Sequence, residues 1–132
     1  MQTLNIRSGQ REELIAITGE LRGLVREQGW QSGALFVYCP HSTAALTINE
    51  NADPDVARDM RFFMNRLVPR LPEFRHAEGN SDAHIKTSLF GPHCLLPVED
   101  GEIRLGTWQG VYFCEWDGPR KRSLWVQFLP GI

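Results

Sequence analysis

The order of strand-like and helix-like segments constrains the fold of this chain more than any other feature of its sequence. An almost unbroken apolar run at residues 34–39 predicts a buried strand, and Asp53-Pro54 predicts a helix start because both residues suit those positions. After Gly91-Pro92, four strand-like segments follow without another helix. Because strands and helices do not alternate as in a doubly wound parallel sheet, we predict an α+β fold with a largely antiparallel sheet.

Turn residues and helix caps give the bounds of the other elements. We expect a β-hairpin over residues 4–18 with Ser8-Gly9-Gln10 as its turn. Thr18 then caps a helix that stops at Gly29. The remaining elements are strands at 34–39, 44–49, 94–98, 102–105, 107–116 and 124–128, a helix at 53–67, and a helix at 83–89 that Ser81 or Asp82 caps.

The helix at 53–67 has the clearest apolar pattern in the chain. Its apolar side chains recur at intervals of four, three, one and three residues, at Val56, Met60, Phe63, Met64 and Leu67. This is the spacing of one face of an α-helix. We therefore predict an amphipathic helix, which Pro69 and Pro72 end.

Composition limits the class of protein. The 132 residues and the 42 % hydrophobic content predict a single domain over residues 1–132 with a sizeable core. A net charge of −2 argues against a nucleic-acid partner. No apolar run approaches the ~18 residues that span a bilayer, and no signal-peptide pattern opens the sequence. Because the three cysteines are widely spaced and odd in number, we expect them to be reduced, as in a cytoplasm. Together these features predict a soluble, cytoplasmic protein with no membrane partner.

His41 is the first candidate for a functional residue. It follows Pro40 at the end of a predicted buried strand and precedes Ser42 and Thr43. An imidazole beside hydroxyl groups can bind a metal ion or accept a proton. A histidine that is only hydrogen-bonded to the loop backbone fits the same pattern, so the sequence leaves both interpretations open.

His76 and His84 enclose a polar segment that can fold both imidazole rings toward one point. Their separation of eight residues matches no standard zinc motif, so spacing alone argues against a metal site more than for it. Carboxylates that could serve as further ligands or could orient a histidine are available at Glu50, Asp82 and Glu115. His93 follows Gly91-Pro92 at a turn and is interpreted as a surface residue.

Two other segments have polar residues at turns. Glycines on both sides of Thr107, Trp108 and Gln109 predict either a structural bulge or the close approach of a ligand. The basic cluster Arg120-Lys121-Arg122 follows a tight turn, and Lys121 and Arg122 are interpreted as solvated. The guanidinium of Arg120 suits a phosphate, although a solvated arginine is the commoner case at such a turn.

Six phrases taken together resemble the YjbQ-like family, which is also called the secondary thiamine-phosphate synthase family. They occur in matching order over nearly the whole chain. They are Pro-His-Ser-Thr-Ala-Ala at 40–45, Asn-Glu-Asn-Ala-Asp-Pro at 49–54, the segment from His76 to His84, Ser-Leu-Phe-Gly-Pro at 88–92, Gly-Thr-Trp-Gln-Gly at 106–110 and Glu-Trp-Asp-Gly-Pro-Arg at 115–120.

The resemblance implies a YjbQ-like domain that is a homotrimer with an α+β fold. It also implies a site in which His41, His76 and His84 gather a metal ion or an anion. The implied reaction joins a hydroxymethylpyrimidine diphosphate to a thiazole phosphate, giving thiamine phosphate and pyrophosphate. A divalent metal (zinc, magnesium or manganese) on the three histidines, or Arg120 with backbone N–H groups, would stabilise the leaving phosphate. We expect no organic cofactor.

On this basis we assign residues to two roles. The catalytic candidates are His41, His84, Glu50 and Glu115, with either glutamate as a base or as the group that orients a histidine. The candidates for binding a phosphorylated small molecule are Ser42, Thr43, Asn49, Thr107, Gln109 and Arg120. The alternatives are a trimeric module that binds phosphate or metal without catalysis, and a metal-dependent hydrolase. The sequence has no glycine-rich phosphate loop and no aspartate cluster for magnesium diphosphate.

Overall fold

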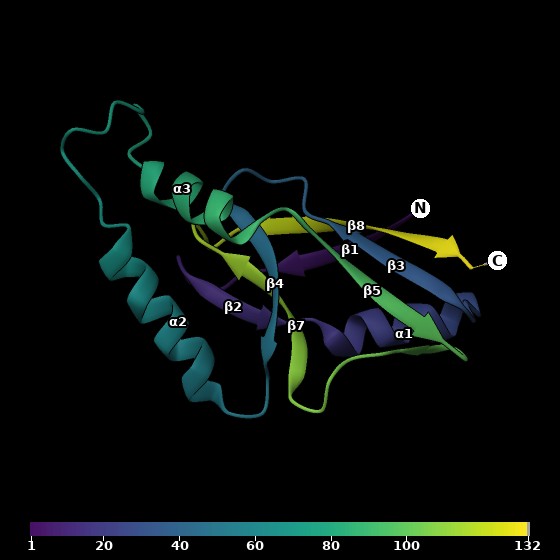
Figure 1. Cartoon of the computed structure of the whole chain (residues 1–132). Coiled ribbons are helices and arrows are strands. Elements are labelled where there is room, and N and C mark those ends of the chain that lie inside the picture. The colour runs from purple at the N-terminus through teal and green to yellow at the C-terminus, as the bar shows by residue number, and fades with distance from the viewer. Residues whose placement is uncertain (132) are drawn as a thin grey trace.

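Two antiparallel sheets and three helices make up the computed structural model of residues 1–131 (Figure 1). The five-stranded sheet has the order β1 (Gln2–Arg7), β8 (Lys121–Pro130), β3 (Gly33–Tyr38), β5 (His93–Glu99) and β6 (Glu102–Ile103). The three-stranded sheet has the order β2 (Glu13–Ala16), β7 (Gln109–Glu115) and β4 (Ala44–Glu50). Every strand pair is antiparallel, which confirms the predicted α+β fold.

The larger core joins both sheets to α1 (Thr18–Gln28). Strand β8 shows how a sheet face contributes to it: Leu124 and Val126 are buried, whereas Trp125 between them is exposed. Alternate side chains of a strand point to opposite faces, so only one face of β8 reaches the core. From the helix, Leu21 and Val25 complete this core. Gly29 ends α1 in the left-handed conformation at φ 68°, as the sequence predicts.

Helices α2 (Pro54–Leu67) and α3 (Ser81–Phe90) lie together on the side of the three-stranded sheet (Figure 1). They form a second, smaller apolar cluster with that sheet, in which Met64 of α2 and Ala83 of α3 pack with Tyr112 and Trp116. Asp53 caps α2, since its Oδ1 accepts a hydrogen bond of 2.9 Å from the N–H of Asp55. The predicted start of this helix is thereby confirmed.

Only part of the apolar face predicted for α2 is buried within the described part of the chain. Met64 is the one residue of α2 that is buried among residues 1–131, whereas Phe63 is 59 % and Leu67 is 55 % exposed. The helix turns Ala57 and Met64 toward the sheet, and this leaves the side with Phe63 and Leu67 without a partner in the described part of the chain. The periodicity therefore predicts the helix correctly, but it does not identify the face that packs inward.

The predicted hairpin over residues 4–18 is wrong. Strand β1 pairs with β8 and strand β2 pairs with β7, so the two strands belong to different sheets. The segment between them is held by distant residues, because the hydroxyl of Ser8 binds Glu115 and the N–H of Ser8 binds the carbonyl of Arg120. Alternation predicts each strand, but it does not reveal the partner of either one.

Two predicted helix caps also differ from the structure. Ile17 stands at the N-cap of α1, and the hydroxyl of Thr18 instead accepts a hydrogen bond of 2.9 Å from the N–H of Val111. Asn80, rather than Ser81 or Asp82, stands at the N-cap of α3. In both cases the polar side chain near the helix start forms a tertiary hydrogen bond. Thr18 bonds to Val111 of β7, and Asn80 bonds to Asp117 in the loop after β7. No helix among residues 1–131 has the length and apolar character needed to cross a membrane.

Candidate functional site

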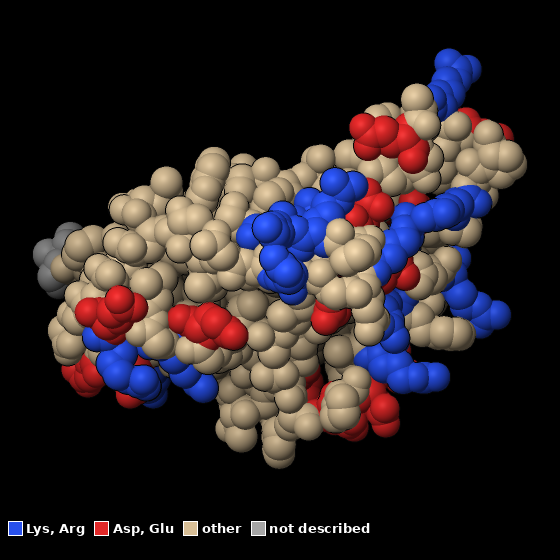
Figure 2. Space-filling view, turned by 180° about the vertical axis from the view of Figure 1, so that it is seen from behind, with Lys and Arg blue, Asp and Glu red and all other residues tan. Residues whose placement is uncertain are grey.

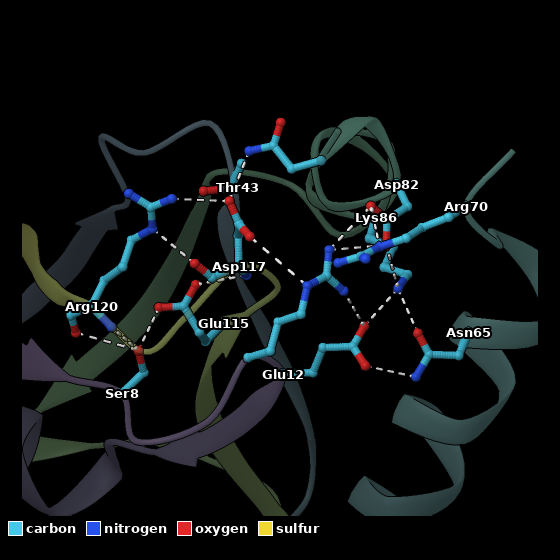
Figure 3. A network of polar contacts seen from close by, with 12 residues as sticks. Ser8, Glu12, Thr43, Asn65, Arg70, Asp82, Lys86, Glu115, Asp117 and Arg120 are labelled. Carbon is cyan, nitrogen blue, oxygen red and sulfur yellow. Dashed lines mark hydrogen bonds and ion pairs between the residues drawn. The ribbon is translucent and has the colours of Figure 1, made fainter. Parts of the chain in front are cut away.

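A continuous network of polar contacts connects segments that are far apart in the sequence (Figure 3). It joins Ser8 and Glu12 before β2, Thr43 before β4, the first turns of α3, and the loop that contains Asp117 and Arg120 between β7 and β8. The network contains several of the predicted site residues. It therefore defines the candidate site.

Glu115 lies at the centre of this network and is fully buried. Its Oε1 accepts hydrogen bonds from the Ser8 hydroxyl at 2.7 Å and from Arg122 Nε at 2.9 Å, and its Oε2 accepts one from the N–H of Asp117 at 3.0 Å. Burial opposes ionisation of Glu115, but the hydrogen bonds from Arg122, Ser8 and Asp117 outweigh it and lower the pKa of the carboxyl group. Glu115 is therefore an ionised anchor whose oxygens are already occupied.

The interpretation of Arg122 as a solvated residue is wrong. Strand β8 begins at Lys121, and the alternation of its side chains turns Arg122 into the protein, where it is 8 % exposed. Besides Glu115, the guanidinium of Arg122 binds Oγ1 of Thr43 at 2.8 Å. If the strand predicted at 124–128 is extended back to 121, its alternation puts Arg122 on the same inward face as Leu124. That pattern was the sequence signal for a buried Arg122.

The loop with His41, Ser42 and Thr43 connects β3 to β4 and is fixed to the start of β8. Nε2 of His41 lies 3.0 Å from both the N–H and the carbonyl oxygen of Ser123. Burial and the positive charge of Arg122 lower the pKa of His41 below its usual value. At neutral pH the imidazole is thus uncharged. Ser42 is exposed, whereas Thr43 is buried on Arg122.

Arg120 is held by the turn that precedes it. Its Nε donates a hydrogen bond of 2.8 Å to the carbonyl of Asp117, and its Nη2 donates one of 3.0 Å to Oδ2 of the same residue. The side chain is nevertheless 51 % exposed. A guanidinium carries five N–H donors, so the rest of them remain free to bind a ligand.

The first turn of α3 connects to Arg120 through Asp117. Nδ2 of Asn80 donates a hydrogen bond of 2.7 Å to the Oδ2 atom that Arg120 also binds. The carbonyl of Asn80 accepts from the N–H of His84, whose ring meets that of His76 at 5.2 Å between centroids. The loop therefore does bring the rings of His76 and His84 together, and His76 Nε2 lies 3.9 Å from Glu78 Oε2.

The histidines do not form a three-histidine centre within one chain. Among residues 1–131, no group of three or more His, Cys, Asp or Glu side chains is arranged to hold a metal ion. His76 and His84 are adjacent to each other, while Nε2 of His41 contacts the backbone of Ser123. A single copy of the chain thus offers two neighbouring imidazoles, His76 and His84, to a metal ion. It does not supply the predicted set of three histidine ligands.

A buried lysine extends the network toward α2, and sequence reasoning missed it. Lys86 has no exposed side-chain surface, and its Nζ lies 2.6 Å from both Glu12 Oε2 and Asn65 Oδ1 (Figure 3). Asp82, one turn earlier in α3, lies 3.5 Å from the same Nζ and also binds Arg11 at 3.2 Å. The i, i+4 spacing of Asp82 and Lys86 was the only local signal for this cluster.

Four other candidates lie away from this network. Asn49 and Glu50 end β4, and Glu50 pairs with Gln109, whereas Thr43 precedes the other end of the strand. Seven residues of strand place the two ends about 20 Å apart. Thr107 lies in the turn before β7 on the same side as Gln109. The structure therefore divides the predicted substrate-binding residues between opposite ends of β4.

The glycine-flanked segment at this far end makes its own local contacts. Oε1 of Gln109 accepts a hydrogen bond of 2.8 Å from the N–H of Gly106. A Cβ atom at Gly110 would lie 2.6 Å from the side chain of Asn51, so this glycine leaves room for Asn51. The close approach of Asn51 therefore accounts for Gly110, while Trp108 remains exposed.

Comparisons with known proteins agree over nearly the whole chain. The family model described as UPF0047 protein YjbQ-like matches residues 2–131. The UPF0047 protein YugU of Bacillus subtilis is 48 % identical over 130 residues, which cover 98 % of each chain. A UPF0047 protein of Archaeoglobus fulgidus is 39 % identical over 128 residues, covering 96 % of this chain and 98 % of the relative.

Solved structures of similar proteins have the same fold. A crystal structure of an uncharacterised conserved YjbQ/UPF0047 family protein from Clostridium acetobutylicum superposes with a TM-score of 0.94 at 43 % identity, covering 98 % of this chain and 100 % of that one. A conserved hypothetical protein from Thermus thermophilus superposes with a TM-score of 0.92 at 40 % identity, with coverage of 98 % and 100 %.

Proposed function

Because the chain belongs to the UPF0047 YjbQ-like family, we propose that it is an enzyme that acts on a phosphorylated small molecule and binds the phosphate group through Arg120. The reaction is the one implied by the sequence resemblance, in which two phosphorylated precursors form thiamine phosphate. The observation that carries the proposal is the geometry of Arg120, whose guanidinium is fixed on Asp117 while half of its side chain faces solvent.

This geometry suits a phosphate for two physical reasons. Asp117 uses Nε and one N–H of Nη2, so the remaining N–H groups can donate to phosphate oxygens. Because Asp117 already restrains the side chain, less rotamer entropy is lost when the ligand binds. Asn80 donates a hydrogen bond to the same Asp117 oxygen and so helps to fix the carboxylate that restrains Arg120.

Where no metal ion is bound to it, His84 is the proposed proton donor for the leaving group. Its backbone is bonded to Asn80, which in turn contacts Asp117 beneath Arg120. His41, with its lowered pKa, is uncharged near neutral pH, and in the tautomer whose Nε2 donates to the carbonyl of Ser123 its Nδ1 suits a role as proton acceptor. The oxygens of Glu115 are occupied, so we propose that Glu115 positions the site rather than acting as a base.

A divalent metal enters the proposal only through a second copy. His76 and His84 supply two imidazoles, and a homotrimer would allow a neighbouring copy to supply the remaining ligands. A bound zinc, magnesium or manganese ion would neutralise charge on the phosphate. The exposed apolar side chains on α2 and α3, which include Phe62, Phe63, Leu67 and Leu89, support self-association.

One observation favours the alternative of a binding module without catalysis. The carboxylate that Arg122 connects to the His41 loop is Glu115, and Arg122, Ser8 and Asp117 already bind it. The Glu115 carboxylate is therefore not free to act with His41 as the general base that a hydrolase needs. In this alternative the same Arg120 site retains a phosphorylated compound without changing it.

Calorimetry with inorganic pyrophosphate tests the binding step, and a thiamine phosphate assay tests the reaction. Arg120→Lys and Arg120→Ala are expected to weaken pyrophosphate binding roughly ten- to a hundredfold. Lysine lacks the bidentate geometry of the guanidinium, and alanine removes its N–H donors altogether. Lys121→Ala is the matched control, since Lys121 is an exposed neighbouring cation. Wild-type binding by Arg120→Ala would refute the phosphate site. Binding without product would support the non-catalytic alternative.

A further inference from the structure

A pocket that is separate from the candidate site lies between α2 and the three-stranded sheet. Its volume is about 390 Å³, which falls within the range of small-molecule sites. Leu14, Ala57 and Tyr112 contribute to an apolar floor. None of the residues that line this α2 pocket belongs to the polar network around Glu115 and Asp117.

One wall of the α2 pocket is cationic. Arg58 and Arg61 line it and are three positions apart on α2, so they lie on neighbouring turns of the same helix face. Basic side chains gather on the side of the molecule where α2 lies, as the view from behind shows (Figure 2). This wall can therefore receive a negatively charged group.

The charge of these two arginines is poorly neutralised by the protein. Arg61 is partly buried, yet within residues 1–131 it makes no hydrogen bond or ion pair. In the described part of the chain Arg58 pairs only with its neighbour Asp59, and both side chains are mostly exposed, so this ion pair is weak. A partly buried cation without a partner is favourable only when water or a ligand solvates it.

The opposite wall limits the kind of anion that fits. Glu13 lines it, and although its Oε1 accepts a hydrogen bond from the N–H of Gly9, its negative charge remains. Gln10 adds a neutral amide on the same wall. A second anionic group placed there would be repelled, so a ligand with one anionic end and an apolar or neutral body fits best.

We propose that the α2 pocket binds a small organic monoanion, with its carboxylate on Arg61 and Arg58 and its apolar body over Leu14, Ala57 and Tyr112. The carboxylate completes the hydrogen bonds of a guanidinium in the planar, paired geometry that arginine favours. The apolar body covers the floor between helix and sheet. This site is independent of the proposed function, because it uses neither Arg120 nor the histidines.

Benzoate is the probe, and its neutral isostere benzamide is the matched control ligand. Amide chemical shifts in a titration of the whole chain should move at Leu14, Ala16 and Ala57 as benzoate is added. Benzamide should bind at least tenfold more weakly because it lacks the charge. Arg61→Gln should weaken benzoate at least tenfold, whereas Arg66→Gln, elsewhere on the same helix, should leave it unchanged.

Three results would overturn the proposal. They are no benzoate-dependent shifts at the pocket, equal affinity for benzoate and benzamide, or unchanged benzoate affinity in Arg61→Gln. Circular dichroism of Arg61→Gln checks that the variant is folded. Arg120→Ala should bind benzoate like the wild type, so the loss of pyrophosphate binding and the loss of benzoate binding report on different sites.

Discussion

The Glu115 carboxylate and the Arg122 guanidinium form a buried ion pair in which Arg122 Nε lies 2.9 Å from Glu115 Oε1. Through Arg122 the pair binds Thr43, and through Ser8 and Asp117 it reaches the turn that precedes Arg120. This one ion pair thus connects the loop that contains Thr43 to the turn that precedes Arg120. Its integrity should govern the stability of the site and of the whole fold.

We expect Glu115→Gln to destabilise the protein by roughly 3–5 kcal/mol, because it leaves the Arg122 charge buried without a partner. The double variant Glu115→Gln with Arg122→Met removes that charge and should lose less stability than the single variant. Urea unfolding measures both. Arg104→Ala, which removes the exposed pair with Glu99, is the control and should cost less than about 1 kcal/mol. A single variant that is as stable as the wild type would refute the role of the pair.

His41 should make the stability depend on pH. Its pKa is lowered by folding, so the unfolded chain binds more protons below the usual value of 6.5. The free energy of unfolding should therefore be fully maintained above pH 6.5 and should decrease as the pH falls toward the lowered pKa. His41→Gln should flatten this part of the pH profile. An imidazole that titrates at or above 6.5 by NMR would contradict the structure.

Gly110→Ala tests whether the glycine-flanked segment is structural. The new Cβ would lie 2.6 Å from Asn51, so the variant should lose about 1–3 kcal/mol of stability. Gly106→Ala is the matched control, because the atoms nearest to its Cβ would belong to the flexible Gln109 side chain, at 3.2 Å or more. Thermal unfolding compares the two variants. Equal melting temperatures would show that Asn51 gives way without cost.

The self-association proposal predicts a particle mass three times that of the 15.1 kDa chain. Light scattering at micromolar concentration measures this mass. Replacing exposed Phe63 and Leu67 with serine should shift the mass toward the monomer if α2 forms part of the contact. Leu95→Ser is the control, because Leu95 is exposed on β5 in the other sheet. It removes apolar surface away from α2 and should leave the particle mass unchanged. A wild-type mass near 15.1 kDa would exclude the trimer.

The metal proposal predicts uptake that depends on the paired histidines. Purified without a His-tag, the protein should bind zinc or manganese stoichiometrically, and the double variant His76→Ala with His84→Ala should lose this uptake. His93→Ala is the control, because His93 is exposed on β5. Elemental analysis after dialysis provides the measurement. Unchanged uptake by the double variant would rule out the pair as ligands.

Features that depend on neighbouring residues could be predicted from the amino-acid order. Asp53-Pro54 specifies the start of α2, and Gly29 specifies the end of α1, where it adopts positive φ. The element order likewise predicts the α+β class. Caps, turns and alternation act over a few positions, and so their physical basis can be read directly from the chain.

The meeting of distant groups depended on the packed fold. Ser8 and Glu115 are 107 positions apart, and no local rule joins them or assigns β1 and β2 to different sheets. The same holds for Arg122, because burying its charge is favourable only where Glu115 lies opposite. Local preferences fix the elements, whereas strand partners and the pairing of buried charges depend on the packing of the whole chain.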